Sequence, residues 1–512
     1  MPLGSSSAAP VTRPGPRRDS QERSVRSVTA ASGSRWSCSR SFSSGTAQLS
    51  FRSRSLRHSP IPQLSCRILT AASARLARSL RAGVQAAPAA VCSRCCAEGE
   101  VVKKASLKGV PTPEERAPRL ADLRMRKMAR SAHAYVRGSA DRFYAWLDSQ
   151  ASGTLPDGPP VWICGDCHLG NLGPLADASG RVAVQIRDLD QSVIGNPVHD
   201  LLRLGLSLTT AARSADLPGV ITSRMAEALI DGYEQAFDDA RTDETKRAER
   251  PTVVRVAMKQ ALHRSWRKLD RQTIDGVAPR IPLGKRFWPL SEEESQAVRT
   301  LFESQSGLAV REALGRAVHG GGKIDVLDAA FWVKGCSSLG RRRYAVLLDI
   351  DGTCSPGGPP CLVDIKQAAA AAAPRHAGAT MPRDNAKRVA EGARHVSPLL
   401  GDRMLAARLD GCAVVIRELM PQDLKIDADR LTEADAVKAA HFLALVVGQA
   451  HAGQMDAPTR RSWLHELQAR RPGSPGAPSW LWRSMVELAV AHEAEYLEHC
   501  RRYALRRGAG KR

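Results

Sequence analysis

The feature that most constrains the fold is the order in which helical and β-rich segments follow one another. Apolar residues recur at helical spacing near both ends of the region after residue 110, and Gly- and Pro-containing turns separate three β-rich segments between them. The helical segments are residues 120–149, 199–213, 223–237, 432–453 and 479–507, and the β-rich ones are residues 331–350, 360–368 and 412–420. A run of strands set between two helical regions predicts an α+β fold with a mostly antiparallel sheet.

This order divides the chain into four predicted parts. Residues 1–105 form an extension rich in Ser, Arg and Ala, and residues 106–320 form a mainly helical lobe. Residues 321–430 form a β-rich lobe, and residues 431–512 form a C-terminal helical region that we expect to pack against the first lobe.

The extension lacks regular apolar periodicity, which predicts a disordered segment. Up to residue 97 it holds fifteen Arg, no Lys and only two acidic residues, so it supplies 13 units of the net charge of +23. Such a segment resembles an organelle transit peptide, and a start codon assigned too far upstream is the alternative that we favour. The remainder is only mildly basic, so the net charge is weak evidence for nucleic-acid binding.

Composition also bears on the cellular setting. No run approaches the roughly 20 apolar residues of a membrane-spanning helix, so we expect a cytoplasmic protein without a membrane partner. The twelve Cys are too scattered to suggest a disulfide framework, which fits a reducing compartment. Cys92, Cys95 and Cys96 look like half of a zinc site, but no second Cys/His pair follows at a suitable spacing.

The stretch "CGDCHLGN", residues 164–171, has two readings. Cys164, Cys167 and His168 have the C-x-x-C-H spacing of a covalent haem site. That reading needs export, for which no signal is evident, and the motif follows a short apolar strand instead of opening a helix. Asp166, His168 and Asn171 form G-D-x-H-x-x-N, a spacing that suits a catalytic carboxylate followed by a metal-binding amide.

A second polar loop follows the predicted strand "VAVQI". Asp188 and Asp190 come at its end, and we expect two adjacent strands, each ending in an acid, to bring their carboxylates to one mouth. Carboxylate and amide oxygens are the ligands that Mg²⁺ prefers. Asp200 opens the next helix, where it either caps the helix or braces the catalytic loop.

Two further segments complete the parts that transfer of phosphate from ATP requires. Gly335, Ser337, Ser338 and Gly340 belong to the turn "KGCSSLG", a flexible loop of the kind that covers phosphates, although such turns alone are weak evidence. Lys366 stands at the end of the strand "CLVDIKQ", where a lysine is able to meet the α- and β-phosphates of ATP.

These residues carry a resemblance. The stretch from Cys164 to Leu208 looks like the catalytic and metal loops of aminoglycoside phosphotransferases and choline-kinase-like enzymes. More closely, Met125 to Ala452 resembles an uncharacterised bacterial family, domain of unknown function 2252, in "MARSAHAYVRGSADRFY", "VKGCSSLGRRRYAVLL", "LVDIKQA", "KRVAEGARHVSP" and "VVIRELMPQDLKID". The chain departs from the pattern at Cys167, at Arg187 and in "CSSLG", where small residues, Asn and a Gly-richer loop are usual.

The resemblance implies a protein-kinase-like two-lobe fold with its lobes in permuted order, because the acids precede the loop and the lysine. It implies ATP and Mg²⁺ as cofactors and an unknown acceptor that bears a hydroxyl group. The implied catalytic residues are Asp166 and His168, the latter as a loop-bracing partner; the metal ligands are Asn171, Asp188 and Asp190; and the nucleotide site comprises Gly335, Ser337, Ser338, Gly340, Lys366 and Glu391. Glu391 is expected to pair with Lys366, Asp200 to brace the loop, and Arg137 to bind an oxyanion or form a structural salt bridge.

Several alternatives remain open from the residues. A kinase-like scaffold also serves nucleotidyl transferases and nucleotide-binding pseudoenzymes. Asp349 and Asp351 in "LLDIDGT" look like the first motif of haloacid-dehalogenase-type phosphatases, although the strand that follows at once favours a hairpin. A basic nucleic-acid-binding protein would use residues 341–343 and 255–271, but aromatic residues make up only 4% of the chain, which argues against base stacking. The sequence does not indicate the oligomeric state.

Overall fold

The computed structural model describes residues 109–509, with gaps at residues 178, 239–249, 264–279, 305–308, 310–322, 351–360, 427–430 and 472–475. Contacts divide the chain into residues 1–99 and residues 100–512, and every described residue belongs to the second unit. The predicted extension, the Cys92–Cys96 cluster and Asp351 therefore lie outside the described residues.

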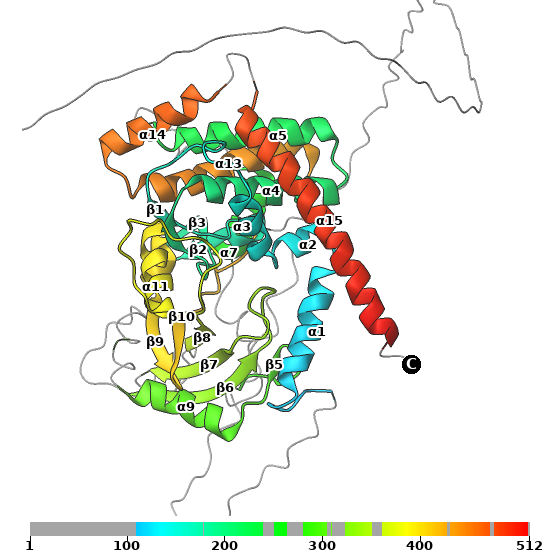
Figure 1. The fold of residues 1–512 in the computed structure, drawn as a ribbon. Coiled ribbons are helices and arrows are strands. Elements are labelled where there is room, and N and C mark those ends of the chain that lie inside the picture. The colour runs from blue at the N-terminus through cyan, green and yellow to red at the C-terminus, as the bar shows by residue number, and fades with distance from the viewer. Residues whose placement is uncertain are drawn as a thin grey trace, which may run out of the picture. The chain divides into compact units, whose positions relative to one another are not determined.

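The described part has an α+β fold, as the sequence predicts, and its largest sheet has six strands (Figure 1). The strand order is β5-β6-β7-β8-β10-β9, and all neighbours are antiparallel. The strands are β5 (Phe287–Trp288), β6 (Ile324–Trp332), β7 (Arg343–Ile350), β8 (Cys361–Gln367), β9 (Met404–Leu409) and β10 (Cys412–Glu418). The predicted β-rich segments are thus confirmed as one antiparallel sheet.

The two faces of this sheet differ in chemistry. On one face, alternate apolar residues of β7, β8 and β10, such as Val346, Ile365 and Ile416, pack against α1 (Arg116–Met128) and α9 (Glu292–Glu303). On the other face, the register places Arg343 opposite Lys366 and Arg417 opposite Asp364. Because side chains alternate along a strand, these four charged residues share that second face.

The expected lobe boundary at residue 320 does not separate the six-stranded sheet from all of the helices and strands before it. Helices α1 and α9 and strand β5 precede residue 320, yet they pack with or belong to the six-stranded sheet. Their sequence shows helical periodicity, which predicts a helix but does not indicate which surface will bury its apolar side.

The remaining helices share a second and larger hydrophobic core. Within it, α13 packs against α5 and α4, and α15 packs against α4, so helices from the two ends of the region lie side by side (Figure 1). The helices of this part are α2 (Ala132–Val136), α3 (Ala140–Asp148), α4 (Val198–Ser214), α5 (Gly219–Gln235), α7 (Thr252–Leu262), α11 (Asn385–Val396), α12 (Pro398–Gly401), α13 (Glu433–Ala452), α14 (Ala457–Ala469) and α15 (Ser479–Ala509).

Two short antiparallel ladders position the polar loops. Strand β1 (Val161–Ile163) pairs with β4 (Val193–Gly195), and β2 (Leu172–Ala176) pairs with β3 (Val182–Ile186). The expectation that β1 and β3 are adjacent strands is wrong. The loops after them still meet, because one runs from β1 to β2, through the short 3-10 turn η1 (Leu169–Asn171), and the other runs from β3 to β4.

Among the described helices, none combines the length and the apolar character that crossing a membrane requires.

Candidate functional site

The loop of residues 164–171 is held at its start by Asp200. This buried carboxylate, in the first turn of α4, accepts hydrogen bonds from the backbone N–H groups of Cys164 (2.7 Å) and Gly165 (2.9 Å). Gly165 has φ +73°, and a Cβ there would lie 2.2 Å from the carbonyl oxygen of Gln191. Only glycine therefore lets the two polar loops approach this closely.

Asp166 points from this loop into a buried ion pair with Arg203. Arg203 Nε donates to Asp166 Oδ1 at 2.9 Å, and the same guanidinium donates to the carbonyl of Val136. Burial raises the pKa of Asp166, and the positive charge of Arg203 opposes this shift. The ion pair engages Oδ1 and fixes the orientation of the carboxylate.

Asn171 joins the two loops. Its Nδ2 donates to the backbone carbonyls of Asp188 (2.8 Å) and Asp166 (3.3 Å), and the backbone N–H of Arg187 donates to the carbonyl of Asn171 (2.8 Å). The amide N–H groups are therefore committed to the backbone, which leaves the side-chain carbonyl oxygen as its available ligand atom.

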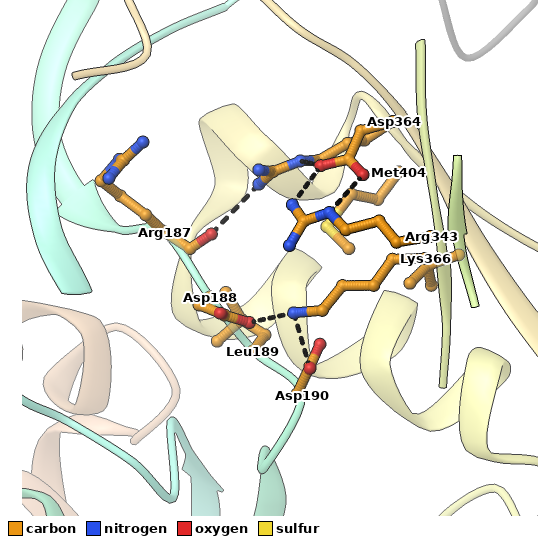
Figure 2. A pocket seen from close by; sticks show the side chains of 10 residues that line it. Arg187, Asp188, Leu189, Asp190, Arg343, Asp364, Lys366 and Met404 are labelled. Atoms are coloured by element: carbon orange, nitrogen blue, oxygen red, sulfur yellow. Dashed lines mark hydrogen bonds and ion pairs between the residues drawn. The ribbon is translucent and has the colours of Figure 1, made fainter. Parts of the chain in front are cut away.

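Lys366 reaches the second loop from the sheet (Figure 2). Its Nζ lies 3.0 Å from Asp188 Oδ1 and 2.6 Å from Asp190 Oδ2. The Asp188 side chain is 50% exposed, whereas those of Lys366 and Asp190 are 9% and 12% exposed. The three residues thus converge as the sequence predicts, with one carboxylate facing open space.

The lysine separates the acidities of the two carboxylates. Enclosure opposes ionisation of both, but the charge of Lys366 lowers the pKa of Asp188 below its usual range. In Asp190, enclosure and the negative charge of Asp188 raise the pKa in spite of Lys366. As pH falls, Asp190 is therefore the first of the two carboxylates to take up a proton.

A second ion-pair cluster lies beside Lys366 on the same sheet face (Figure 2). Asp364 accepts two hydrogen bonds from Arg343, at 2.9 and 2.5 Å, and lies 3.4 Å from Arg417 Nε. Arg417 also donates to the carbonyl of Arg187 at 3.1 Å. Burial opposes ionisation of Asp364, but the two arginines lower its pKa below the usual range.

The predicted ion pair between Glu391 and Lys366 is wrong. Glu391 pairs with Arg394 (3.0 Å) and His395 (3.4 Å) on its own helix, and its side chain is 40% exposed. The residue of α11 that turns toward the site is Arg388, which donates to the carbonyls of Asp190 (3.0 Å), Ala369 (2.8 Å) and Ser192. Three backbone acceptors hold Arg388, so α11 supports the acidic loop without touching Lys366.

The Gly/Ser loop between β6 and β7 faces the polar loops. Gly335 and Gly340 both adopt positive φ, +89° and +99°, and a Cβ at Gly335 would meet Ser338 Oγ at 2.2 Å. A cavity of about 150 Å³ lies between this loop and the acids. Its predicted lining residues are Asp166, His168, Asn171, Asp188, Asp190, Gly335, Ser337, Ser338 and Arg137, whereas Gly340, Lys366 and Glu391 are not among the residues of its wall.

His168, from the loop of residues 164–171, and Arg137, which lies against this loop at Gly170, are both on the wall of the cavity. Burial lowers the pKa of His168 well below its usual range, and the charges of Arg137 and Arg203 act in the same direction. Its Nδ1 is buried without a hydrogen-bond partner among the described residues. Arg137 has no ion pair with any carboxylate that the structure describes, so the expected structural salt bridge is not formed there.

Sequence reasoning did not place five residues at this site, namely Arg203, Arg343, Asp364, Arg388 and Arg417. Arg203 carries a usable signal, because a single arginine interrupts the apolar run "LLRLGLSL" three residues after Asp200, on the same side of the helix. Asp364 and Arg417 occupy inward positions of otherwise apolar strands. A charge in such a position needs a partner, which predicts an ion pair but not its identity.

The donor set fits Mg²⁺ bound together with phosphate. Among the described residues, no three His, Cys, Asp or Glu side chains converge closely enough to hold a metal by themselves. Mg²⁺, however, is usually bound through one or two carboxylates plus substrate phosphates. Asp188, Asp190 and the carbonyl oxygen of Asn171 would supply the protein ligands on the cavity wall.

The geometry also weighs against the haem and phosphatase readings. Cys164 and Cys167 are completely buried, and Cys164 Sγ lies 3.5 Å from the carbonyl of Asp188, which leaves no surface for a macrocycle. Asp349 lies at the far end of β7 from Arg343, and β7 has antiparallel neighbours on both sides, as the hairpin reading predicts. A haloacid-dehalogenase-type site requires parallel ones.

The nucleic-acid reading finds few available cations. Arg343 is buried against Asp364, Arg342 pairs with Asp410 (2.9 Å), and Arg341 Nη1 lies 3.7 Å from Asp190. The described part of the 255–271 tract packs apolar residues of α7, among them Ala257 and Ala261, into the core.

No curated protein and no solved structure matches the chain. The model of a family described as an uncharacterised protein conserved in bacteria, domain of unknown function 2252, matches residues 116–502. This match covers most of the chain and includes every described residue of the site, so the chain belongs to that family.

Proposed function

We propose that this protein is an ATP- and Mg²⁺-dependent phosphotransferase that acts on a hydroxyl group, with a kinase-like two-lobe arrangement in permuted order. One observation carries the proposal. Lys366, from a strand late in the chain, pairs with Asp188 and Asp190, from an early loop, and these two carboxylates line a cavity together with Asp166 and the Gly/Ser loop. Permutation does not affect such chemistry, which depends only on where the groups converge.

The charge of the cavity supports a polyanionic ligand. Its wall contains six basic residues and three carboxylates. The basic residues are Arg137, Arg187, Lys334, Arg343, Arg417 and Lys425, and the acids are Asp166, Asp188 and Asp190. A surplus of positive charge in an enclosed space favours a triphosphate and raises its local concentration.

Each side chain has a role that its contacts suit. Asp166, oriented by Arg203, accepts the proton of the acceptor hydroxyl, and its raised pKa makes it a stronger base than an exposed aspartate. Lys366 exchanges one of its two carboxylate partners for the α- and β-phosphates, while Asp188, Asp190 and Asn171 hold Mg²⁺. Bound Mg²⁺ neutralises the charge that develops on the phosphates.

Thermal unfolding of the full chain tests this proposal. ATP with Mg²⁺ at about 100 times the dissociation constant should stabilise the protein by about 2.7 kcal/mol. Asp188→Ala should remove the Mg²⁺-dependent part of this stabilisation, and Lys366→Met should remove most of it. Lys387→Met, at an exposed position of α11, is the matched control and should keep it. Absence of any stabilisation of the wild-type chain would refute the proposal.

Product analysis then identifies the reaction. Slow transfer to water should release ADP, and Asp166→Asn should suppress that release while keeping the stabilisation by ATP and Mg²⁺. Release of pyrophosphate with AMP would show nucleotidyl transfer instead. Stabilisation without any product would show a nucleotide-binding pseudoenzyme, and either result would overturn the phosphotransferase assignment.

A further inference from the structure

Most charges on the cavity wall are balanced by a partner. Asp166 pairs with Arg203, and Lys366 pairs with both Asp188 and Asp190. The basic residues Arg343 and Arg417 share Asp364. These contacts account for all three carboxylates of the wall and for two of its six cations.

Three cations of the wall have no carboxylate within ion-pair distance in the described ranges, namely Arg137, Arg187 and Lys334. Lys334 belongs to the Gly/Ser loop, where its Nζ lies 3.9 Å from the centroid of the Trp332 ring. It therefore sits with the nucleotide side of the proposed site. Arg137 and Arg187 come from other elements and require a separate explanation.

Arg137 lies beside the loop that carries Asp166. It follows the last residue of α2, and its Nε is 3.1 Å from where a Cβ on Gly170 would be. This Nε is buried and has no hydrogen-bond partner among the described residues. A buried guanidinium N–H without an acceptor costs free energy, which an oxyanion in the cavity would recover.

Arg187 also has a buried guanidinium N–H group without an acceptor among the described residues. Its Nε is also buried without a described partner, and its terminal nitrogen donates only to the backbone carbonyl of Asp423, at 3.2 Å. Burial lowers the pKa of Arg187 to about 10, the charges of Asp423 and Asp188 oppose this shift, and those of Arg417 and Arg137 add to it. Arg137 and Arg187 both lie on the wall of the same cavity.

We propose that Arg137 and Arg187 bind a phosphate monoester on the acceptor, so that the substrate is a hydroxyl compound that already carries one phosphate. This inference rests on the proposed function and names its substrate class. Two neighbouring guanidiniums match the double charge of a phosphate monoester better than the single charge of a carboxylate. The buried, uncharged His168 beside them offers an additional hydrogen bond through Nδ1.

The position of the two arginines fits the transfer step. The acceptor oxygen forms a bond to the γ-phosphorus, the bond from that phosphorus to the β-phosphate oxygen breaks, and ADP leaves. The hydroxyl proton passes to Asp166. The phosphate already on the acceptor takes no part in bond making, and its arginine contacts hold the hydroxyl near Asp166.

Calorimetric titration of the full chain with inorganic phosphate tests the subsite. The protein is first saturated with Mg²⁺ and a non-hydrolysable ATP analogue, so that the phosphate cannot report on the nucleotide site. We expect phosphate to bind this complex. Arg137→Gln and Arg187→Gln should each weaken phosphate binding about tenfold or more and change the affinity for the analogue less than about threefold.

The controls separate the subsite from general effects of charge and folding. Arg142→Gln, at an arginine of α3 whose side chain is 51% exposed, should change neither affinity. Arg137→Lys keeps the charge and should restore part of the phosphate affinity, which distinguishes a binding contact from a loss of folding. Lys366→Met should weaken the analogue and spare phosphate.

Three results would overturn the inference. The first is absence of phosphate binding to the saturated protein, and the second is equal weakening of phosphate and analogue in Arg137→Gln. The third is competition by acetate as strong as that by phosphate, which would indicate a carboxylate acceptor. Failure of the proposed function is distinguishable from all three. In that case no ATP analogue binds, whereas phosphate binds the free protein and still depends on Arg137.

Discussion

Two ion-pair clusters lie side by side on one face of the six-stranded sheet (Figure 2), and they differ in how far their carboxylates are exposed to solvent. The first, Asp364 with Arg343 and Arg417, lies on β7, β8 and β10, and the side chain of Asp364 is 1% exposed. The second joins Lys366 to Asp188 and Asp190 of the loop after β3, and the side chain of Asp188 is 50% exposed.

The difference separates a structural role from a chemical one. In the first cluster, two arginines share one buried carboxylate inside the sheet, so Asp364 has almost no surface at which a ligand or a metal ion could replace them. In the second, one carboxylate keeps half its surface toward the cavity, so its partner can be exchanged. If the proposed function is correct, two positions on one face of β8, Asp364 and Lys366, serve stability and ligand binding respectively.

The largest expected effect on stability comes from breaking the closed cluster. Asp364→Asn leaves Arg343 and Arg417 without their carboxylate in a buried setting, which should lower the free energy of unfolding by about 3–5 kcal/mol. Urea denaturation measures this loss. Asp410→Asn, which removes the partner of Arg342 at the surface, is the control and should cost no more than about 1 kcal/mol. Equal losses in both variants would remove the distinction between the clusters.

The contribution of the Asp364 cluster to the free energy of unfolding should depend on pH. The pKa of Asp364 is lowered in the folded protein, so its ion pairs contribute in full above the ordinary aspartate pKa and are lost as pH falls through the folded-state value. The difference in stability between the wild type and Asp364→Asn should therefore narrow below about pH 4, by on the order of 2 kcal/mol. Stability measured against pH for both proteins checks this, and a constant difference would contradict it.

Breaking the open cluster should affect stability less and binding more. Lys366→Met leaves Asp188 and Asp190 facing each other, but solvent reaches Asp188, so we expect a loss of about 1–2 kcal/mol. The same variant should weaken ATP with Mg²⁺ by at least about tenfold, whereas a folded Asp364→Asn protein should lose affinity by less. If Lys366→Met destabilises the chain as much as Asp364→Asn does, the open cluster is structural as well.

The smallest effect is expected at Glu391. Its contacts with Arg394 and His395 are exposed pairs within one helix, so Glu391→Gln should change the free energy of unfolding by less than about 0.5 kcal/mol. It should leave nucleotide affinity unchanged. A large loss of affinity would show that α11 moves and brings Glu391 to Lys366 when the ligand binds.

The sequence predicted the elements better than their partners. Hydrophobic periodicity indicated α4, α5, α13 and α15, because burial of one side of a helix imposes that period. The β-rich composition and the Gly/Pro turns indicated β7, β8 and β10. The convergence of Lys366 with Asp188 and Asp190 came from family resemblance, since no local pattern relates residues 178 positions apart. The geometry now supports that convergence.

The errors about charged residues of the site concern the direction in which their side chains point. An α-helix turns by about 100° per residue, and the pattern of α11 does not fix its rotation finely enough to tell which charge meets the site. Arg388 is 3% exposed and faces the acidic loop, whereas Glu391 lies on the edge of the helix. The role of Arg203 was not predicted for a related reason. Its partner, Asp166, reaches it only because of the path that the loop of residues 164–171 takes.

The separation of 178 residues between Asp188 and Lys366 also bears on biosynthesis. At about 5–20 residues per second, a ribosome needs roughly 9–36 s to advance from the first to the second. During that interval the nascent acidic loop has neither its lysine nor the sheet face that carries it, and α13 has not yet been made to cover α5. A translation product that ends before β8 therefore contains Asp188 and Asp190 without Lys366, so premature termination there yields no fragment in which these three residues meet.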